Sequence, residues 1–284
     1  MICIHHNKDL DGFTSGAIVA KRFPDCKLIG WDYKDPIPWD KITYGEPVVM
    51  IDVSFPMVDM IKLLHISQYK LTIIDHHISF KKEFDASDHP NKKDITYVYE
   101  NGKAACEIGW EYYFPGKDMP DAVRLLGQYD TWRNENKVYW ENAILPFQFY
   151  MRLICVSPDS FPEWLFDHND SIPDYISIGK DILKYQEQQD MLACERSAFA
   201  TTAYGLRALC LNTRAFSSNT MKSVYNPEKH DVMIGFEYAA GKWTISLRSD
   251  KPDIDVSLIA KARGGGGHKA AAGFEVDSFE KIFV

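Results

Sequence analysis

Histidine and aspartate are concentrated near the amino terminus of the chain, in residues 3–12. His5 comes at the end of a short apolar run, and Asp9 and Asp11 follow it in the sequence Asp-Leu-Asp-Gly. Imidazole and closely spaced carboxylates form a ligand set that suits a divalent transition metal such as Mn²⁺. The Asp-x-Asp-Gly pattern is also common in turns for conformational reasons alone. The segment therefore predicts either a metal site or an acidic turn.

Two further apolar runs end in side chains of the same kinds. Asp52 follows one run, and Asp75, His76 and His77 follow another. A single aspartate after a strand is often a helix cap, whereas two histidines beside an acid have few purely structural uses. The carboxyl ends of parallel strands meet at one edge, where open α/β sheets bind their ligands. We therefore expect five side chains to converge there: His5, Asp9, Asp11, Asp52 and His76.

An alternation of strands and helices is predicted to hold these residues in place. Apolar runs predict strands at residues 2–5, 27–31, 48–53, 71–75 and 95–99. Helical patterns at 13–23 and 56–64 lie between them, so the fold class is α/β, with a doubly wound, mainly parallel five-stranded sheet. Further helices are expected at 104–113, 121–128, 141–155 and 162–166. Asp130 follows one of these helices, either as another ligand or in an exposed turn.

The remainder of the chain predicts a second, smaller α/β domain. A long helical pattern at 176–203 is expected to link the two domains. Strands are expected at 206–212, 232–238, 243–248 and 272–276, and a helix at 256–262. The predicted organisation is a metal-binding domain at 1–175, a helical linker at 176–203 and a substrate-binding domain at 204–284.

Four consecutive glycines and a histidine lie in the second domain, at residues 264–268. Glycine lets the backbone approach an anion closely, with its N–H groups forming a concave nest. Polyglycine is also a common flexible hinge. The run therefore predicts either a phosphate-binding loop or a hinge.

Composition narrows the class of protein and of partner. The 284 residues are 45% hydrophobic, and no apolar run approaches the roughly 18 residues that span a membrane. The start lacks the pattern of a signal peptide, and the six cysteines are scattered, which favours free thiols and a cytoplasmic location. A net charge of −8 disfavours a long phosphate backbone as a partner. We expect a short substrate and no membrane partner; the oligomeric state stays open, a homodimer included.

The motifs, taken in order, resemble those of the DHH phosphoesterase family. The first has three residues between His5 and Asp9, and the others are Asp52-x-Ser54, Asp75-His76-His77 and Asp130. The glycine run, continued to Gly273, resembles the signature of the DHH-associated C-terminal domain. Within the family, the chain most resembles the oligoribonucleases of the NrnB and NrnA type, the nano-RNases.

The resemblance implies two divalent metal ions, with Mn²⁺ the expected metal, and a role for each motif. One ion would be held by His5, Asp9 and Asp52, with His6 as the alternative histidine. The other ion would be held by Asp11, Asp52, His76 and Asp130. Asp75 would orient these ligands, and His77 would face the substrate phosphate. The residues that would hold the rest of the substrate are Arg248, Gly265, Gly266, Gly267 and His268. A surface salt bridge is the alternative role for Arg248.

The implied activity is hydrolysis of a phosphodiester by attack of water. The expected substrate is a short single-stranded oligonucleotide, cleaved to 5′-mononucleotides. The alternative enzymes are a phosphodiesterase for cyclic or linear dinucleotide signals and a phosphatase for 3′-phosphoadenosine 5′-phosphate (pAp). A nucleotide-sensing protein without catalysis is the alternative from another class.

Overall fold

The computed structural model describes residues 1–33, 35–214, 216 and 220–284. It divides into two compact units, Met1–Leu183 and Lys184–Val284. The long helix α8 (Ile172–Ser197) contains the boundary between them. No helix among the described residues has the length and apolar character needed to cross a membrane.

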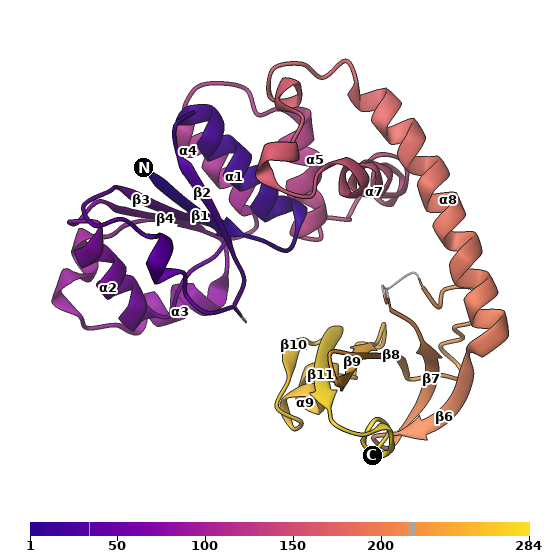
Figure 1. The fold of residues 1–284 in the computed structure, drawn as a ribbon. Coiled ribbons are helices and arrows are strands. Elements are labelled where there is room, and N and C mark those ends of the chain that lie inside the picture. Colours follow the sequence, from indigo (N-terminus) through magenta and orange to yellow (C-terminus); the bar gives the residue numbers. More distant parts are fainter. Residues whose placement is uncertain (34, 215, 217–219) are drawn as a thin grey trace. The chain divides into compact units, whose positions relative to one another are not determined.

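A sheet of five parallel strands forms the centre of the first unit (Figure 1). The strand order β2-β1-β3-β4-β5 reverses direction between β1 and β3, as in doubly wound folds. This confirms the predicted fold class. The strands are β1 (Ile2–His6), β2 (Lys27–Trp31), β3 (Val48–Ile51), β4 (Leu71–Asp75) and β5 (Thr96–Tyr99).

Helices cover both faces of this sheet because alternate strand residues point to opposite sides. Cys3 of β1 packs in a cluster with residues of α1 and α4, whereas Ile4 packs in a cluster with residues of α2. The helices are α1 (Leu10–Arg22), α2 (Met57–Ile66), α3 (Ile78–Ala86) and α4 (Ala105–Tyr113). Figure 1 shows α1 and α4 on one side of the sheet, and α2 and α3 on the other.

A helical layer beyond α1 and α4 completes the first unit. Its core is the largest apolar cluster of the unit and includes the fully buried Phe147. The helices of this layer are α5 (Asp121–Asp130), α6 (Lys137–Tyr139), the π-helix η3 (Trp140–Ile144) and α7 (Leu145–Ile154). Short 3₁₀ helices lie at η1 (Trp39–Lys41), η2 (Pro90–Asp94), η4 (Pro158–Ser160) and η5 (Glu163–Phe166).

A six-stranded mixed sheet forms the second unit, in the order β10-β11-β9-β8-β7-β6. Helix α9 (Val256–Lys261) packs against this sheet. The 3₁₀ helix η6 (Phe279–Lys281) follows the last strand. The strands are β6 (Phe199–Ala203), β7 (Leu206–Asn212), β8 (Val232–Ala239), β9 (Lys242–Arg248), β10 (Gly266–His268) and β11 (Ala271–Val276).

Two of the element boundaries that differ from the prediction have clear physical causes. Helix α1 begins at Leu10 rather than residue 13, because the Asp9 carboxylate caps it by accepting a hydrogen bond from the Gly12 N–H at 3.0 Å. The predicted linker helix at 176–203 was wrong at its end. Helix α8 stops at Ser197, and Phe199–Ala203 is strand β6, which pairs with β7. Non-local strand pairing there outweighs the local helical pattern.

Candidate metal centre

Acidic and histidine side chains from four parts of the first unit converge at the carboxyl edge of its sheet. Asp52 follows β3, and His76 follows β4. Asp9 and Asp11 come from the start of α1, and Asp130 ends α5. Three groups of these side chains have ligand atoms close enough to hold a metal ion: His6, Asp9 and Asp52; Asp11, His76 and Asp130; and Asp52, His76 and His77.

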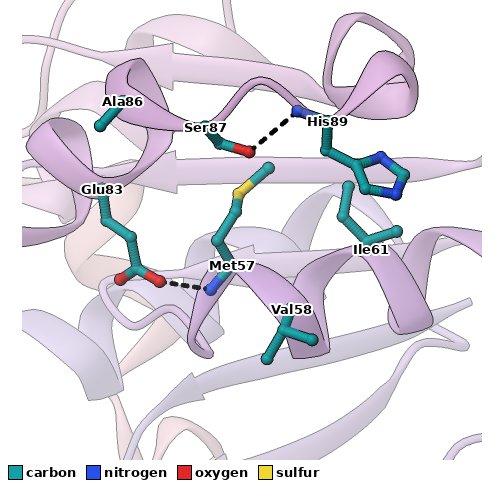
Figure 2. A pocket seen from close by; sticks show the side chains of 7 residues that line it. All are labelled: Met57, Val58, Ile61, Glu83, Ala86, Ser87 and His89. Carbon is teal, nitrogen blue, oxygen red and sulfur yellow. Dashed lines mark hydrogen bonds between the residues drawn. The ribbon is translucent and has the colours of Figure 1, made fainter.

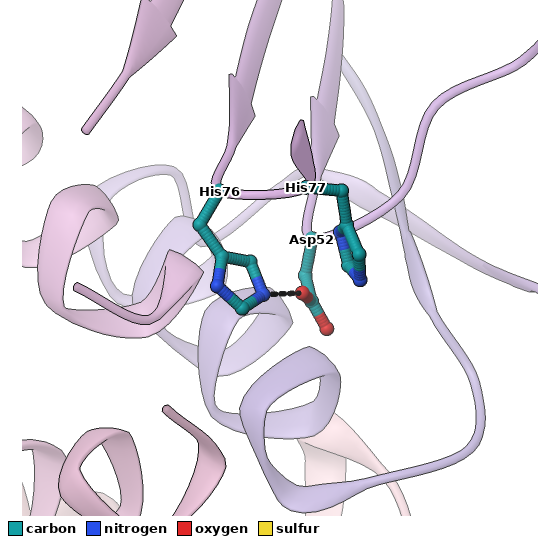
Figure 3. Close-up of side chains that lie close together, drawn as sticks. All are labelled: Asp52, His76 and His77. Atoms are coloured by element: carbon teal, nitrogen blue, oxygen red, sulfur yellow. Dashed lines mark ion pairs between the residues drawn. The ribbon is translucent and has the colours of Figure 1, made fainter. Parts of the chain in front are cut away.

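Asp52 lies at the centre of this arrangement. Its Oδ2 is 3.4 Å from the Nδ1 of His6, and its Oδ1 is 3.3 Å from the Nε2 of His76. Figure 3 shows His76 directed at this carboxylate, with His77 beside it. Asp52 is 1% exposed and has a left-handed backbone, with φ at +61°. That conformation ends the strand and is uncommon outside glycine, asparagine and aspartate.

The structure places His6, not His5, among the carboxylates, which corrects the choice made from the sequence. The Nδ1 of His6 is 3.1 Å from Asp9 Oδ2. The Nδ1 of His5 is instead 2.8 Å from the backbone carbonyl of His6, and its ring lies edge-to-face with Phe13 of α1. Successive strand residues point to opposite faces. His5 and His6 therefore differ in role: His5 packs in the interior, and His6 lies among the carboxylates.

Helix N-termini hold Asp9 and Asp11. Asp9 uses Oδ1 to cap α1, which leaves Oδ2 directed at His6. The Asp11 carboxylate accepts hydrogen bonds from the backbone N–H groups of Ala105 (2.9 Å) and Cys106 (2.7 Å), at the start of α4. Unpaired N–H groups at a helix start attract a carboxylate, so α4 fixes the position of Asp11. The sequence showed no signal for this contact between segments far apart in the chain.

Gly12 allows α1 to begin this close to β1. A Cβ atom at this position would lie 2.2 Å from the backbone oxygen of His6, which is closer than real Cβ contacts. Glycine is therefore required by the approach of the two segments that carry His6 and Asp9.

The crowded carboxylates shift the protonation of the centre. Burial and the neighbouring Asp52 raise the pKa of Asp11 to about 8. Burial and the neighbouring Asp11 raise the pKa of Asp130 to about 7. The Nε2 of His76 is 3.6 Å from Asp130 and 3.7 Å from Asp11. Burial lowers the pKa of His76, but the surrounding carboxylates outweigh burial and raise it to about 10. The centre therefore binds protons strongly when it holds no other cation.

Asp75 organises the loop that carries the two histidines. It is fully buried, and its Oδ1 accepts hydrogen bonds from the backbone N–H groups of His76 (2.8 Å) and His77 (3.1 Å). The same oxygen lies 2.7 Å from the Nδ1 of His77, and Oδ2 accepts from the Ser54 hydroxyl at 3.2 Å. Burial raises the pKa of Asp75, but the bond to His77 outweighs it and the net shift is downward. Asp75 is thus a fixed anion that orients both histidines.

One aromatic neighbour of the centre was not singled out from the sequence. The ring of Tyr33, which follows β2, lies 6.1 Å from the ring of His6 and 6.2 Å from that of His77. Tyrosine after a strand carries no sequence signal for a site, because its position beside both histidines depends on strand order.

The candidate substrate-binding residues lie in the second unit, in or just before the edge strand β10 and at the end of β9. Gly266, Gly267 and His268 form β10, which pairs with β11. His268 and Arg248 both align with Ala271, one on each side of it, so the two residues lie in one row across three strands. Residues in such a row face the same side of a sheet. The run is therefore an edge strand rather than a free loop, with Gly265 just before it.

An apolar pocket elsewhere in the first unit contains none of the predicted site residues. It lies between α2 and the end of α3 and is lined in part by Met57, Val58 and Ile61 (Figure 2). Glu83 accepts a hydrogen bond there from the backbone N–H of Met57 at 2.6 Å.

The fold and the centre together define an open α/β protein with an acid–histidine cluster at the carboxyl edge of its parallel sheet. Residues 1–126 match the model of the DHH family, N-terminal domain. This part of the chain is therefore similar in sequence to that domain.

Proteins similar to nearly the whole chain were found in sequence and in fold. The uncharacterized protein R106 of Acanthamoeba polyphaga mimivirus is 26% identical over 311 aligned positions, covering 99% of this chain and 70% of that protein. The pGpG-specific phosphodiesterase PggH from Vibrio cholerae is similar in fold, with a TM-score of 0.57, 14% identity and coverage of 98% and 94% of the two chains. RecJ from Thermus thermophilus, in complex with Mn²⁺, has a TM-score of 0.51 and 14% identity, covering 99% of this chain and 50% of RecJ.

Proposed function

We propose that the protein is a metal-dependent phosphodiesterase that hydrolyses short oligonucleotides to 5′-mononucleotides. The observation that carries the proposal is the position of Asp52, whose two oxygens lie 3.3 and 3.4 Å from histidines of two different ligand groups. A carboxylate between two sets of ligands suits a pair of divalent ions that share it. The DHH-family match of residues 1–126 supports the same class of reaction.

The described side chains fit two divalent ions. The nitrogen–oxygen spacings of 3.1 to 3.7 Å within the groups are close to the ~3.0 Å between adjacent ligands of an octahedral ion with bonds of ~2.1 Å. Two buried atoms, His6 Nδ1 and Asp52 Oδ2, make no hydrogen bond within the described part of the chain. The mixture of imidazole and carboxylate suits Mn²⁺. One ion would be held by His6, Asp9 and Asp52, and the other by Asp11, Asp52, His76 and Asp130.

When bound, two such ions would polarise the phosphate and increase the acidity of water at the site. The protein would hold the substrate through His77. Its Nδ1 faces Asp75 at 2.7 Å, which leaves Nε2 for a phosphate oxygen. Burial lowers the pKa of His77, but Asp75 outweighs it and the net shift is upward. His77 would therefore donate a charge-assisted hydrogen bond to the phosphate.

The second unit has side chains of its own that suit part of a nucleotide. Arg248 and His268 lie in one row of its sheet, two strands apart, or about 10 Å at the usual strand spacing. A guanidinium and an imidazole on one face suit a phosphate group or a base edge.

A second candidate reaction is hydrolysis of a dinucleotide signal. The observation that favours it is the similarity in fold to a phosphodiesterase described as specific for pGpG. The same centre would serve both reactions, because the bond broken is a phosphodiester in each.

Incubation with a panel of labelled substrates tests the proposal. Metal-free protein would be given Mn²⁺ or chelator together with dinucleotides, trinucleotides, a long single-stranded RNA, cyclic dinucleotides or pAp. The proposed function predicts Mn²⁺-dependent release of 5′-mononucleotides, fastest from the di- and trinucleotides. Preference for a cyclic dinucleotide or pAp would favour the alternative enzymes. Binding without turnover at any metal concentration would contradict catalysis and indicate a nucleotide sensor.

A further inference from the structure

Trp132 stands two residues after Asp130 in a backbone conformation that tryptophan rarely adopts. Helix α5 ends at Asp130, and Trp132 has a φ of +55°. Its N–H donates to the carbonyl of Tyr129 at 3.1 Å, and the next N–H, of Arg133, donates to the carbonyl of Gln128 at 3.0 Å. Glycine is the usual residue at this position of a helix end, because a Cβ atom is disfavoured there. Placing tryptophan here costs stability.

The ring of Trp132 packs edge-to-face with two other aromatic rings, and much of the residue is exposed. The residue is 53% exposed. Its ring meets that of Trp140 at 4.9 Å and 66°, and that of Tyr129 at 6.2 Å and 70°. Trp140 and Tyr129 stack on each other at 5.5 Å and 8°. The Trp132 ring therefore packs against two aromatic rings that are stacked on each other.

Side-chain bonds fix the turn that carries the ring. The Thr131 hydroxyl donates to the carbonyl of Gly127 at 2.7 Å, and the Arg133 Nε donates to the Thr131 hydroxyl at 2.8 Å. The Arg133 guanidinium also pairs with Glu107 of α4. Glu107 is 3% exposed and caps α4 by accepting from the Ala104 N–H at 3.0 Å. The turn is thus tied to the same helix start that holds Asp11.

We propose that Trp132 is the stacking platform for a nucleobase of the substrate, an inference that rests on the proposed function. Two residues of extended chain span at most ~7 Å, so the backbone that carries the ring lies within ~7 Å of the Cα of Asp130, about the length of one nucleotide. Aromatic side chains bind bases of any sequence by stacking. A strained, exposed and rigidly held tryptophan beside an acidic centre is the expected form of such a platform, because strain persists where function requires it. The substrate would therefore be selected for a base, not only for a phosphodiester.

Two variants at Trp132 and one matched control test the platform. Trp132→Gly removes the ring and suits the positive φ, and Trp132→Phe keeps an aromatic ring. Trp164→Ala is the control, because Trp164 is also 53% exposed and lies in η5, outside the three ligand groups. The substrates are diadenylate and its abasic analogue, which has the same phosphodiester and no bases.

The platform predicts that Trp132→Gly raises KM for diadenylate about tenfold, as expected for the loss of one base stack. The same variant should leave the KM for the abasic analogue unchanged and should melt no lower than the wild type. Trp132→Phe and Trp164→Ala should stay close to the wild-type KM. A wild-type KM in Trp132→Gly, or an equal rise for both substrates, would overturn the platform while leaving the proposed function intact.

Failure of the proposed function would look different, because the wild type itself would not cleave diadenylate. Equilibrium binding of diadenylate to the same variants then decides the inference separately. Weaker binding by Trp132→Gly alone supports the platform, and equal binding by all variants overturns it.

Discussion

Each compact unit contains a cluster of charged side chains, and the two clusters balance charge in different ways. In the first unit, Asp11 and Asp52 are almost fully buried, and the ion pairs described for them are with histidines alone. In the second unit, Asp231 pairs with the cations of Arg207 and Lys251, both at 2.6 Å. Lysine and arginine keep their charge at neutral pH, whereas histidine gains charge only by binding a proton.

The difference indicates that fixed cations already balance the carboxylate of the second cluster, whereas the carboxylates of the first cluster lack a fixed countercharge. A buried carboxylate without a fixed countercharge is unfavourable, so the first cluster must be neutralised by protons or by metal ions. The Asp231 cluster needs neither. Changes in metal or pH should therefore act on the first unit and leave the second largely unaffected.

The largest expected effect is that of Asp52→Asn on turnover. The substitution removes the negative charge between the two ligand groups but keeps the size of the side chain, and asparagine tolerates a φ of +61°. We expect the turnover of diadenylate to fall by about 10³-fold or more, measured with Mn²⁺ present. Asp231→Asn is the matched control, because it removes a carboxylate from the cluster that has fixed cations. Near-wild-type turnover in Asp52→Asn would refute the metal centre.

Substitution of Asp75 should have a smaller effect, since Asp75 acts through the histidines. Asparagine cannot accept all the hydrogen bonds that the buried carboxylate receives from His76, His77 and Ser54. We expect Asp75→Asn to lower turnover about 10- to 100-fold, the usual cost of removing a residue that orients metal ligands. Ser54→Ala removes one of these hydrogen bonds and should cost less. If Ser54→Ala costs as much, the orienting role of Asp75 is wrong.

The architecture of the first unit could be predicted because its strands are continuous apolar runs. The positions of Asp52 and His76 after two such runs were sufficient to predict that they converge, since parallel strands end at one edge. The identity of the first histidine was not predictable in this way. His5 and His6 are adjacent, and which one faces the carboxylates depends on the side of the sheet that each residue faces.

Contacts between distant segments account for the other differences. Strand β6 forms at Phe199–Ala203 because β7 pairs with it, and no local pattern shows that partner. Asp11 is held by the amides of Ala105 and Cys106, more than 90 residues away in the sequence. The sequence gives no indication that Trp132 has a positive φ, because this conformation depends on how helix α5 ends.

Removal of metal should make the stability of the first unit depend on pH. Burial and neighbouring charges raise the pKa of Asp11 to about 8 and that of Asp130 to about 7, from a usual value of 3.8. A raised acid pKa adds stability that is complete below about pH 4 and is lost as pH rises through about 7 to 8. Hydrogen exchange of metal-free protein should therefore speed up in peptides of β1 and α1 from about pH 6 to about pH 9, after correction for the intrinsic rate.

Addition of Mn²⁺ should suppress this loss, because bound metal replaces the protons. The protection given by Mn²⁺ should accordingly grow as the pH rises. Equal protection at both pH values, or a metal-free protein that gains stability toward pH 9, would contradict the assignment of Asp11 and Asp130 to the centre.

The smallest expected effect is in the second unit, and its sign is opposite. The Arg207 guanidinium and the Lys251 ammonium hold the pKa of Asp231 well below its usual range. A lowered acid pKa adds stability that is present above about pH 4 and is lost as the pH falls further. Peptides of β7 and β8 should keep the same protection between about pH 6 and about pH 9, with or without Mn²⁺. Asp231→Asn should weaken their protection slightly at neutral pH and leave that of β1 and α1 unchanged. If Mn²⁺ protects β7 and β8 as strongly as β1 and α1, the two clusters do not differ as their charges indicate.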